Sequence, residues 1–349
     1  MFEPGWEPTE PPEAKPVKGS SVLRTVLLVA LGIALILAAF FAPIPIFYAY
    51  LPGPVRDIER LVDVSDARTY SSEGELLLTT VSVDPQVTFV EMVRSQWDDS
   101  TAIVFKEDVT GGQSFDELLD DQRQQMVDSK RRAQEVALAA LDLGRPEGDG
   151  ARVADTEEGA PAHGRLQAGD VIREVDGTPV STTCDVGREI DAHEVGEDVT
   201  VTYERDGSLA SVTLETASLP SDPGEPYIGI YMRDVNYRFD PGVEVEFDTG
   251  RIGGPSAGLM MTLALYDRLT PDDLTSGLKV AGTGTIACDG GVGAIGGIEQ
   301  KVAGAERVGA DVFLAPEANA AAARRIAREI EIVAVSDFTE AVDYLEGLD

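Results

Sequence analysis

The sequence has 349 residues, of which 28 are Lys or Arg and 62 are Asp or Glu, so its formal net charge is −34. Hydrophobic residues make up 43% of the chain, which is enough for packed cores and excludes a wholly disordered protein. At about 100–200 residues per domain, the length indicates two folded domains. Such an acidic chain repels phosphate backbones, so the composition argues against nucleic acid as a partner.

A long uncharged segment near the N-terminus predicts a membrane anchor. Residues 25–51 contain no charged side chain, and about 20 apolar residues are enough to cross the hydrocarbon core of a bilayer. We expect a disordered cytoplasmic tail over residues 1–21 and a single transmembrane helix within residues 22–51. A cleaved signal peptide is the alternative, but its apolar part is usually only about 7–15 residues long.

The far end of this segment carries prolines and aromatic residues. Pro43 and Pro45 would kink or end the helix, and the aromatic residues beyond them would form an interfacial belt, namely Phe47, Tyr48 and Tyr50. Basic residues lie slightly closer to the span on its N-terminal side, which favours a cytoplasmic N-terminus. We therefore expect a cell-membrane protein with the bulk of its chain on the extracytoplasmic side. The charge of that part would keep it soluble, or would reflect a salt-adapted surface.

Short β-rich runs precede a long helical pattern in the soluble part. Strands are predicted within residues 75–83 and 101–105, where β-branched and apolar residues gather. Apolar residues recur with helical spacing over residues 115–143. Gly144 and Pro146 would end this helix.

Residues 146–220 differ in character, because Gly, Asp and β-branched residues dominate them. Strands are expected at 151–154, 170–175, 198–205 and 211–216. The run Glu158-Gly-Ala-Pro-Ala-His-Gly-Arg-Leu-Gln-Ala-Gly-Asp-Val-Ile172 and the turn in Val175-Asp-Gly-Thr-Pro-Val180 resemble the middle of a PDZ domain. PDZ domains bind peptides by adding a strand to a sheet edge and holding a terminal carboxylate. No loop suited to that carboxylate is evident between Gly144 and Ala151. A generic small β domain is the alternative.

Strands and helices alternate in the remainder, residues 226–348, which predicts an α/β domain. The expected strands are 227–232, 242–247, 283–287, 311–315 and 330–335. The expected helices are 256–269, 298–309, 318–328 and 338–348.

A serine in a glycine-rich turn is the first candidate catalytic residue. Gly253-Gly-Pro-Ser-Ala-Gly258 precedes a predicted helix, so Ser256 would lie where backbone N–H groups and the positive helix end meet. Such a position stabilises an oxyanion, as acyl transfer requires. An ordinary serine helix cap is the simpler interpretation of this fragment alone.

The serine also needs a base. The two histidines of the chain, His163 and His193, lie in the PDZ-like block without a protease motif, and we expect both at the surface. They are also too few to indicate a metal site. Lys301, in Gly296-Gly-Ile-Glu-Gln-Lys301, is the better candidate, because burial lowers a lysine pKa and a neutral amine accepts a serine proton. A solvated helix lysine is the alternative.

Together these fragments resemble the proteolytic domain of the Lon proteases, which use a Ser-Lys dyad. The matching stretches are Gly254-Pro-Ser-Ala-Gly258, Gly282-Thr-Gly284, Gly293-Ala-Ile-Gly-Gly-Ile-Glu-Gln-Lys301, Ala303-Gly-Ala305 and Asp311-Val-Phe-Leu-Ala-Pro316. The resemblance implies that Ser256 is the nucleophile, that Lys301 is the general base, and that Thr283 helps to orient the pair. It also implies a homo-oligomer, a hexameric ring.

The resemblance extends upstream to Met126-Val-Asp-Ser-Lys-Arg-Arg-Ala133. The protease domain would then be assembled from residues 66–144 and 226–348, with a mainly-β PDZ-like domain, 146–220, inserted between them. This organisation is similar to a known bacterial arrangement of a membrane-anchored Lon-like peptidase. The chain departs from the Lon pattern at Gly253, where the family commonly has an acidic residue. It also contains no Gly-Lys dipeptide and therefore no Walker A loop.

Two further features are less informative. Gly291-Val-Gly-Ala-Ile-Gly296 fits the dinucleotide-binding pattern, with Asp311 following at 20 residues from Gly291, but its offsets from the predicted strands contradict that geometry. The two cysteines, Cys184 and Cys288, are too few for a disulfide framework or a four-cysteine zinc site. We expect both to be small buried residues, and the sequence leaves open whether they lie close enough for a disulfide.

The sequence thus predicts a membrane-anchored, ATP-independent serine endopeptidase that needs no cofactor or metal. It would act on unfolded or flexible protein segments, which the PDZ-like domain would help to recruit. The alternatives are an inactive PDZ adaptor at the membrane and a nucleotide-dependent enzyme.

Overall fold

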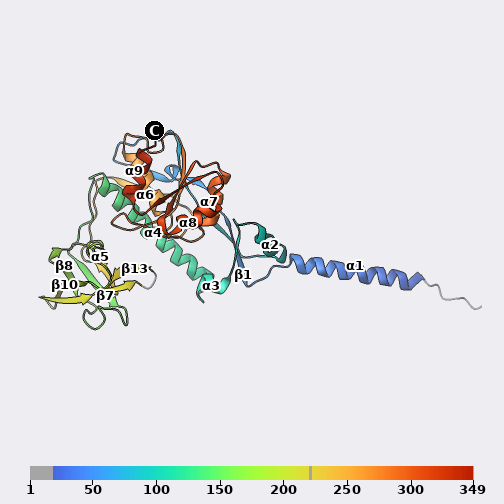
Figure 1. Cartoon of the computed structure of the whole chain (residues 1–349), viewed down its shortest axis with the longest axis horizontal. Coiled ribbons are helices and arrows are strands. Elements are labelled where there is room, and N and C mark those ends of the chain that lie inside the picture. The colour runs from blue at the N-terminus through green and yellow to red at the C-terminus, as the bar shows by residue number, and fades with distance from the viewer. Residues whose placement is uncertain (1–18, 220–221, 349) are drawn as a thin grey trace, which may run out of the picture.

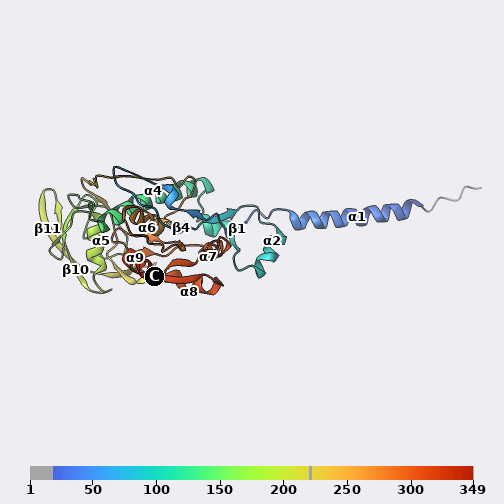
Figure 2. The same cartoon turned by 90° about the horizontal axis from the view of Figure 1, so that it is seen from above.

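The structure is a computed structural model that describes residues 19–219 and 222–348. Residues 1–18 of the predicted tail lie outside the described residues. An α/β domain forms the body of the described chain, helix α1 (Gly19–Phe41) projects from it, and a second, mainly-β unit lies at the end opposite to α1 (Figures 1 and 2).

The predicted anchor segment is helical only in its first part. After α1 the chain becomes extended, and strand β1 (Phe47–Pro52) pairs antiparallel with β5 (Val81–Asp84) and β6 (Ala102–Phe105). The prediction of an interfacial aromatic belt is therefore wrong, since Tyr48 is buried in this small sheet. Pro43 and Pro45 lack the N–H groups that a continuing helix needs, so the helix ends before them.

In the part of the chain that the structure describes, no helix is both long enough and apolar enough to cross a membrane. The transmembrane helix predicted from the sequence is therefore not supported by the structure.

A five-stranded sheet organises the α/β domain. Its order is β2-β4-β16-β19-β20, with β4, β16, β19 and β20 parallel and β2 antiparallel at the edge. The strands are β2 (Arg56–Asp57), β4 (Glu75–Leu78), β16 (Lys279–Gly282), β19 (Val312–Pro316) and β20 (Glu331–Val335). Because β4 precedes the PDZ-like block and β16 follows it, both flanking segments contribute to one sheet.

Successive side chains along these strands point to opposite faces of the sheet, so the domain has one hydrophobic core on each face. In β19, Val312 and Leu314 face one core while Phe313 and Ala315 face the other, as the two-residue period of a strand requires. The first core is covered by helices α4 (Phe115–Ala140), α6 (Gly258–Leu269) and α9 (Phe338–Glu346). The second is covered by α7 (Ile298–Arg307) and α8 (Glu317–Ile326). The predicted α/β architecture is confirmed.

The mainly-β unit has its own sheet, in the order β11-β10-β8-β7-β14. Its members are β7 (Ala151–Thr156), β8 (Val171–Val175), β10 (Asp198–Arg205), β11 (Ser208–Glu215) and β14 (Ile230–Asp234), and β9 (Thr178–Pro179) pairs with β8. The predicted Asp-Gly hairpin turn is present, since Asp176 and Gly177 both have positive φ. The sheet extends beyond residue 220, the predicted end of this block, because β14 pairs with β7.

Helix α5 (Thr183–Asp191) packs beside this sheet and was missed in the sequence. The other elements of the described chain are short. They are η1 (Glu59–Leu61), β3 (Val62–Ser65), α2 (Phe89–Arg94), η2 (Ser95–Trp97), α3 (Lys106–Thr110), β12 (Ala217–Leu219), β13 (Asp222–Tyr227), β15 (Glu244–Phe247), β17 (Thr285–Ile286) and β18 (Val292–Gly293).

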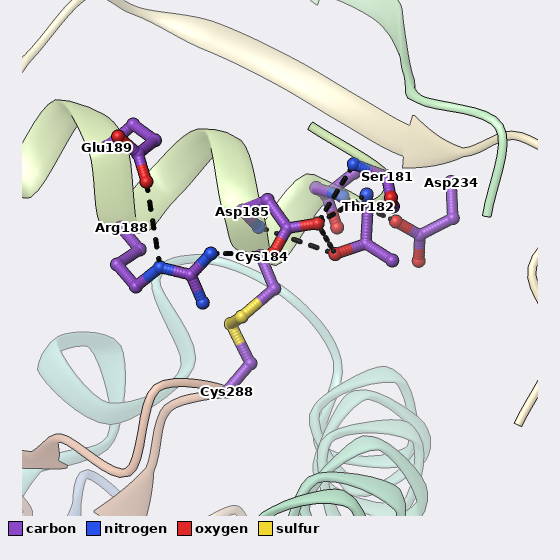
Figure 3. A network of polar contacts seen from close by, with 9 residues as sticks. Ser181, Thr182, Cys184, Asp185, Arg188, Glu189, Asp234 and Cys288 are labelled. Atoms are coloured by element: carbon purple, nitrogen blue, oxygen red, sulfur yellow. Dashed lines mark hydrogen bonds and ion pairs between the residues drawn. A yellow bond between two sulfur atoms is a disulfide. The ribbon is translucent and has the colours of Figure 1, made fainter. Parts of the chain in front are cut away.

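A disulfide joins the two units. Cys184 in α5 is bonded to Cys288 in the loop between β17 and β18, with a Cα–Cα distance of 5.9 Å (Figure 3). The expectation that both cysteines are buried is wrong, since both residues are half-buried, and the disulfide that the sequence left open is present. The pairing spans 104 residues of sequence, so only the folded arrangement reveals it.

Candidate active site

Ser256 lies in a tight turn that leads into α6. Gly254 has a φ of 82°, a left-handed conformation that glycine adopts without strain. The N-cap of α6 is Ala257, which makes no side-chain capping bond. The simpler interpretation of Ser256 as a helix cap is therefore wrong, and its hydroxyl is available for another partner. Gly258 permits close packing, because a Cβ there would lie 2.7 Å from the backbone nitrogen of Ile286.

Hydrogen bonds from two directions fix this turn. The carbonyl oxygen of Ser256 accepts bonds from Thr283 Oγ1 and from the Gly284 amide, both at 3.0 Å. On the other side, Ser129 Oγ of α4 donates to the carbonyl oxygen of Pro255 at 3.0 Å. The turn is thus held between α4 and the segment that follows β16, which restrains the position of the serine.

Lys301 reaches the serine from α7. Gly297, with a φ of 70°, forms the N-cap of that helix, and the Lys301 amide donates to its carbonyl oxygen at 3.1 Å. Lys301 Nζ lies 2.8 Å from Ser256 Oγ and 2.7 Å from Thr283 Oγ1. The structure therefore brings all three sequence-predicted site residues into direct contact.

Burial controls the charge of this lysine. Lys301 is only 3% exposed, and desolvation lowers its pKa from 10.5 to about 7. A large fraction of the amine is therefore neutral near neutral pH. The alternative of a solvated helix lysine is excluded by this burial.

The hydroxyl of Thr283 has a defined direction. Because Thr283 Oγ1 donates its proton to the Ser256 carbonyl, an oxygen lone pair is left to accept a bond from Lys301. Thr283 is fully buried, so water does not compete for these bonds. Thr283 Oγ1 therefore bridges Lys301 Nζ and the carbonyl oxygen of Ser256.

The departure at Gly253 has a steric explanation. A Cβ on Gly253 would lie 3.2 Å from Cβ of Gln122 in α4, and 3.4 Å from its Oε1. These contacts are tight, so a side chain at residue 253 would require Gln122 to move by a few tenths of an ångström.

The histidines lie within the PDZ-like unit, away from this site. His163 is exposed and its Nδ1 lies 3.3 Å from Thr156 Oγ1. His193 is half-buried rather than at the surface, with its Nε2 2.9 Å from Asp176 Oδ2. Among the described residues, no group of three or more His, Cys, Asp or Glu side chains is arranged to hold a metal ion.

The glycine-rich run at 291–296 forms a small hairpin strand and a loop. Strand β18 lies inside it, and α7 begins only at Ile298. Asp311, the candidate ribose ligand, instead accepts a bond from the Lys279 amide at 2.9 Å. This arrangement does not place a strand directly before a phosphate-binding turn, so it does not favour nucleotide binding.

A groove in the PDZ-like unit is the feature that sequence reasoning missed. It lies between α5 and β14, has a volume of about 340 Å³, and is lined mostly by apolar groups that include Ile190, Ile228, Ile230 and Met232. Strand β14 is an edge strand of the sheet, so an extended peptide could pair with it. The loop between β13 and β14, residues 228–229, was not recognised because residues 227–232 were predicted as a single strand of the following α/β domain.

Two family models match this chain. Residues 124–216 match the PDZ domain, and residues 240–345 match the Lon protease (S16) C-terminal proteolytic domain. A Lon protease of Fusobacterium nucleatum is 32% identical over 145 residues, which are 41% of this chain and 19% of that protein. A probable periplasmic serine endoprotease, DegP-like, of Rhizobium meliloti is 36% identical over 88 residues, 25% of this chain and 18% of that protein.

One similar solved structure is the PDZ domain of an SdrC-like protein from Listeria monocytogenes, which is 27% identical in sequence. The match covers 24% of this chain and 87% of that chain, with a TM-score of 0.23. The chain spans less than a fifth of the length of the two curated relatives. The family matches show that this chain contains a Lon-type serine protease domain together with a PDZ domain.

Proposed function

We propose that this protein is an endopeptidase that cleaves unfolded or flexible protein segments with a Ser256–Lys301 dyad. The single observation that carries the proposal is the 2.8 Å separation between Lys301 Nζ and Ser256 Oγ in a site where the lysine is buried. A neutral amine at that distance accepts the hydroxyl proton as the oxygen attacks a carbonyl carbon.

The reaction would proceed in two stages. Ser256 Oγ attacks the peptide carbonyl while its proton passes to Lys301, and the resulting ammonium then protonates the leaving amine to give an ester on Ser256. Water next attacks the ester, again with Lys301 as base, and restores the serine. Thr283 would act as a positioning residue that directs the amine toward the hydroxyl.

The reaction would be independent of ATP in this chain, because peptide hydrolysis itself needs no nucleotide and the sequence has no Walker A loop. Without driven unfolding, folded proteins would be poor substrates. The PDZ domain would instead recruit flexible segments by pairing them with the free edge of β14. A ring of six protomers is proposed from the resemblance to Lon proteases.

We also propose attachment to the cell membrane through the N-terminal segment, with the bulk of the chain extracytoplasmic. Support comes from the uncharged run at 25–51 and from apolar side chains of α1 that stay exposed, such as Leu27 at 60% and Leu35 at 62%. The disulfide adds support, because such bonds persist mainly outside the cytoplasm. Resistance of the protein to alkaline extraction from membranes tests the attachment, and release into the wash contradicts it.

The competing function is a PDZ adaptor whose protease fold is inactive. Unfolded casein distinguishes the two: we expect hydrolysis by the wild-type chain and none by Ser256→Ala or Lys301→Ala. Equal, slow rates for all three proteins would favour the adaptor. Calorimetry with ATP or NAD tests the third alternative, a nucleotide-dependent enzyme, which requires measurable binding.

A further inference from the structure

The groove between α5 and β14 combines an apolar floor with an acidic wall. Glu157 and Asp191 line it, and among the described residues no Lys or Arg does. The remaining lining is apolar or neutral and includes Ile190, Tyr227 and Tyr231. An extended peptide in this groove would therefore meet negative charge but no protein cation.

Of these two acidic residues, Asp191 lies near other carboxylates that raise its pKa. Its pKa is raised to about 6, first by burial and then by the negative charges of Glu225 and Asp289. These three carboxylates come from separate places, namely the end of α5, strand β13 and the loop after Cys288. In the described part of the chain, Asp191 forms no ion pair with a basic side chain. A cation brought by a ligand would relieve the repulsion among them.

The wall that carries Asp191 is fixed before any ligand arrives. The Thr183 amide at the start of α5 donates to Asp234 Oδ1 of β14 at 2.6 Å, so the helix and the edge strand are joined at that end (Figure 3). The bond between Cys184 and Cys288 ties the same turn of α5 to the protease domain. A preformed groove loses little entropy on binding, so the charge of the ligand can decide affinity.

We propose that this groove selects extended, apolar segments that carry a Lys or Arg, with the cation seated against Asp191. The proposal deepens the recruitment role proposed above and rests on it. Charge complementarity identifies the occupant: a peptide backbone pairs with β14, apolar side chains cover the floor, and one basic side chain supplies the missing counter-charge. This contact with Asp191 would make the enzyme favour substrates that carry a basic residue in the segment bound by the groove.

Fluorescence anisotropy on the full chain carrying Ser256→Ala tests this selection without cleavage. The probes are labelled Val-rich peptides in which a single Lys, Gln or Glu is placed at each position in turn. At one or two positions we expect Lys to bind about fivefold more tightly than Gln, and Glu to bind more weakly than Gln. Asp191→Asn should abolish this difference while binding of the Gln peptide is kept.

Glu215→Gln is the matched control, because it removes the same charge from β11 at the opposite edge of the sheet. It should leave the Lys preference unchanged. Equal affinity for Lys, Gln and Glu at every position would overturn the proposed selection but leave peptide recruitment intact. No binding by any peptide would overturn recruitment and selection together, while casein hydrolysis would still report on the dyad separately.

Discussion

Lys301 Nζ lies 2.8 Å from Ser256 Oγ although the two residues are 45 positions apart and belong to different elements. Two glycine-dependent turns make the approach possible, one before α6 at Gly254 and one before α7 at Gly297. Burial lowers the pKa of Lys301 to about 7, so a large fraction of its amine is neutral near neutral pH.

The first prediction concerns the pH dependence of hydrolysis. Only the neutral amine accepts the serine proton, so kcat/KM should rise with pH and level off above about 7, the pKa to which burial lowers Lys301. Initial rates on an unstructured fluorogenic peptide between pH 5 and 10 measure this profile. If kcat/KM instead rises only near pH 10, close to the ordinary pKa of lysine, the amine is not desolvated in the working enzyme.

A second prediction links the same group to stability. In Lys301→Met the buried amine is replaced by an apolar side chain of similar length, so hydrolysis should cease while the Tm rises. The unfolded lysine keeps its proton up to about 10.5, whereas the folded one loses it above about 7. Between these values the unfolded state binds more protons, so wild-type stability falls as pH falls from 10.5 to 7.

The Tm difference between the variant and wild type should therefore be largest at or below pH 7 and shrink toward pH 10. Thermal unfolding followed at several pH values provides the measurement. A Tm gap that stays constant over this range would contradict a pKa difference between the folded and unfolded lysine.

Thr283→Val tests the proposed orienting role of the threonine. The change keeps the shape of the side chain but removes the hydroxyl that bonds Lys301 Nζ and the Ser256 carbonyl. We expect kcat to fall by about tenfold to a hundredfold with little change in KM, because a loosened amine spends less time in line with the hydroxyl. Thr262→Val, at another fully buried threonine, is the control and should retain activity.

The disulfide should matter more for stability and recruitment than for chemistry. Cys184→Ser with Cys288→Ser removes the tether between α5 and the protease domain, which should cost about 2–4 kcal/mol of unfolding free energy. KM for a protein substrate should rise, while turnover of a small peptide that reaches Ser256 directly should not change. Identical effects on both substrates would show that the tether supports the dyad itself.

Local sequence signals predicted much of the α/β domain. The continuous apolar run in β19 and the glycine turn before α6 each specify their own conformation, so the strand and the serine turn lie where they were expected. Strand β1 was missed because its apolar residues resemble the end of a membrane helix, and only pairing with β5 and β6 makes it a strand.

The peptide groove and the disulfide could not be predicted for a different reason. The groove needs β14 to pair with β7, roughly 80 residues earlier in the chain, and the disulfide needs a loop of the protease domain to meet α5. Both depend on how the inserted unit is positioned, which no local pattern encodes. Thr283 was proposed only through family resemblance, and its hydrogen bonds give that proposal a physical basis.

Direct titration of the Lys301 amine tests the central claim most closely. The chain contains six lysines, so NMR of protein with isotope-labelled lysine side chains should resolve them, and the signal missing from Lys301→Met identifies the one in question. We predict that this signal titrates near pH 7, well below 10.5, the ordinary pKa of lysine. A Lys301 signal that stays protonated up to about pH 10 would contradict the proposed dyad.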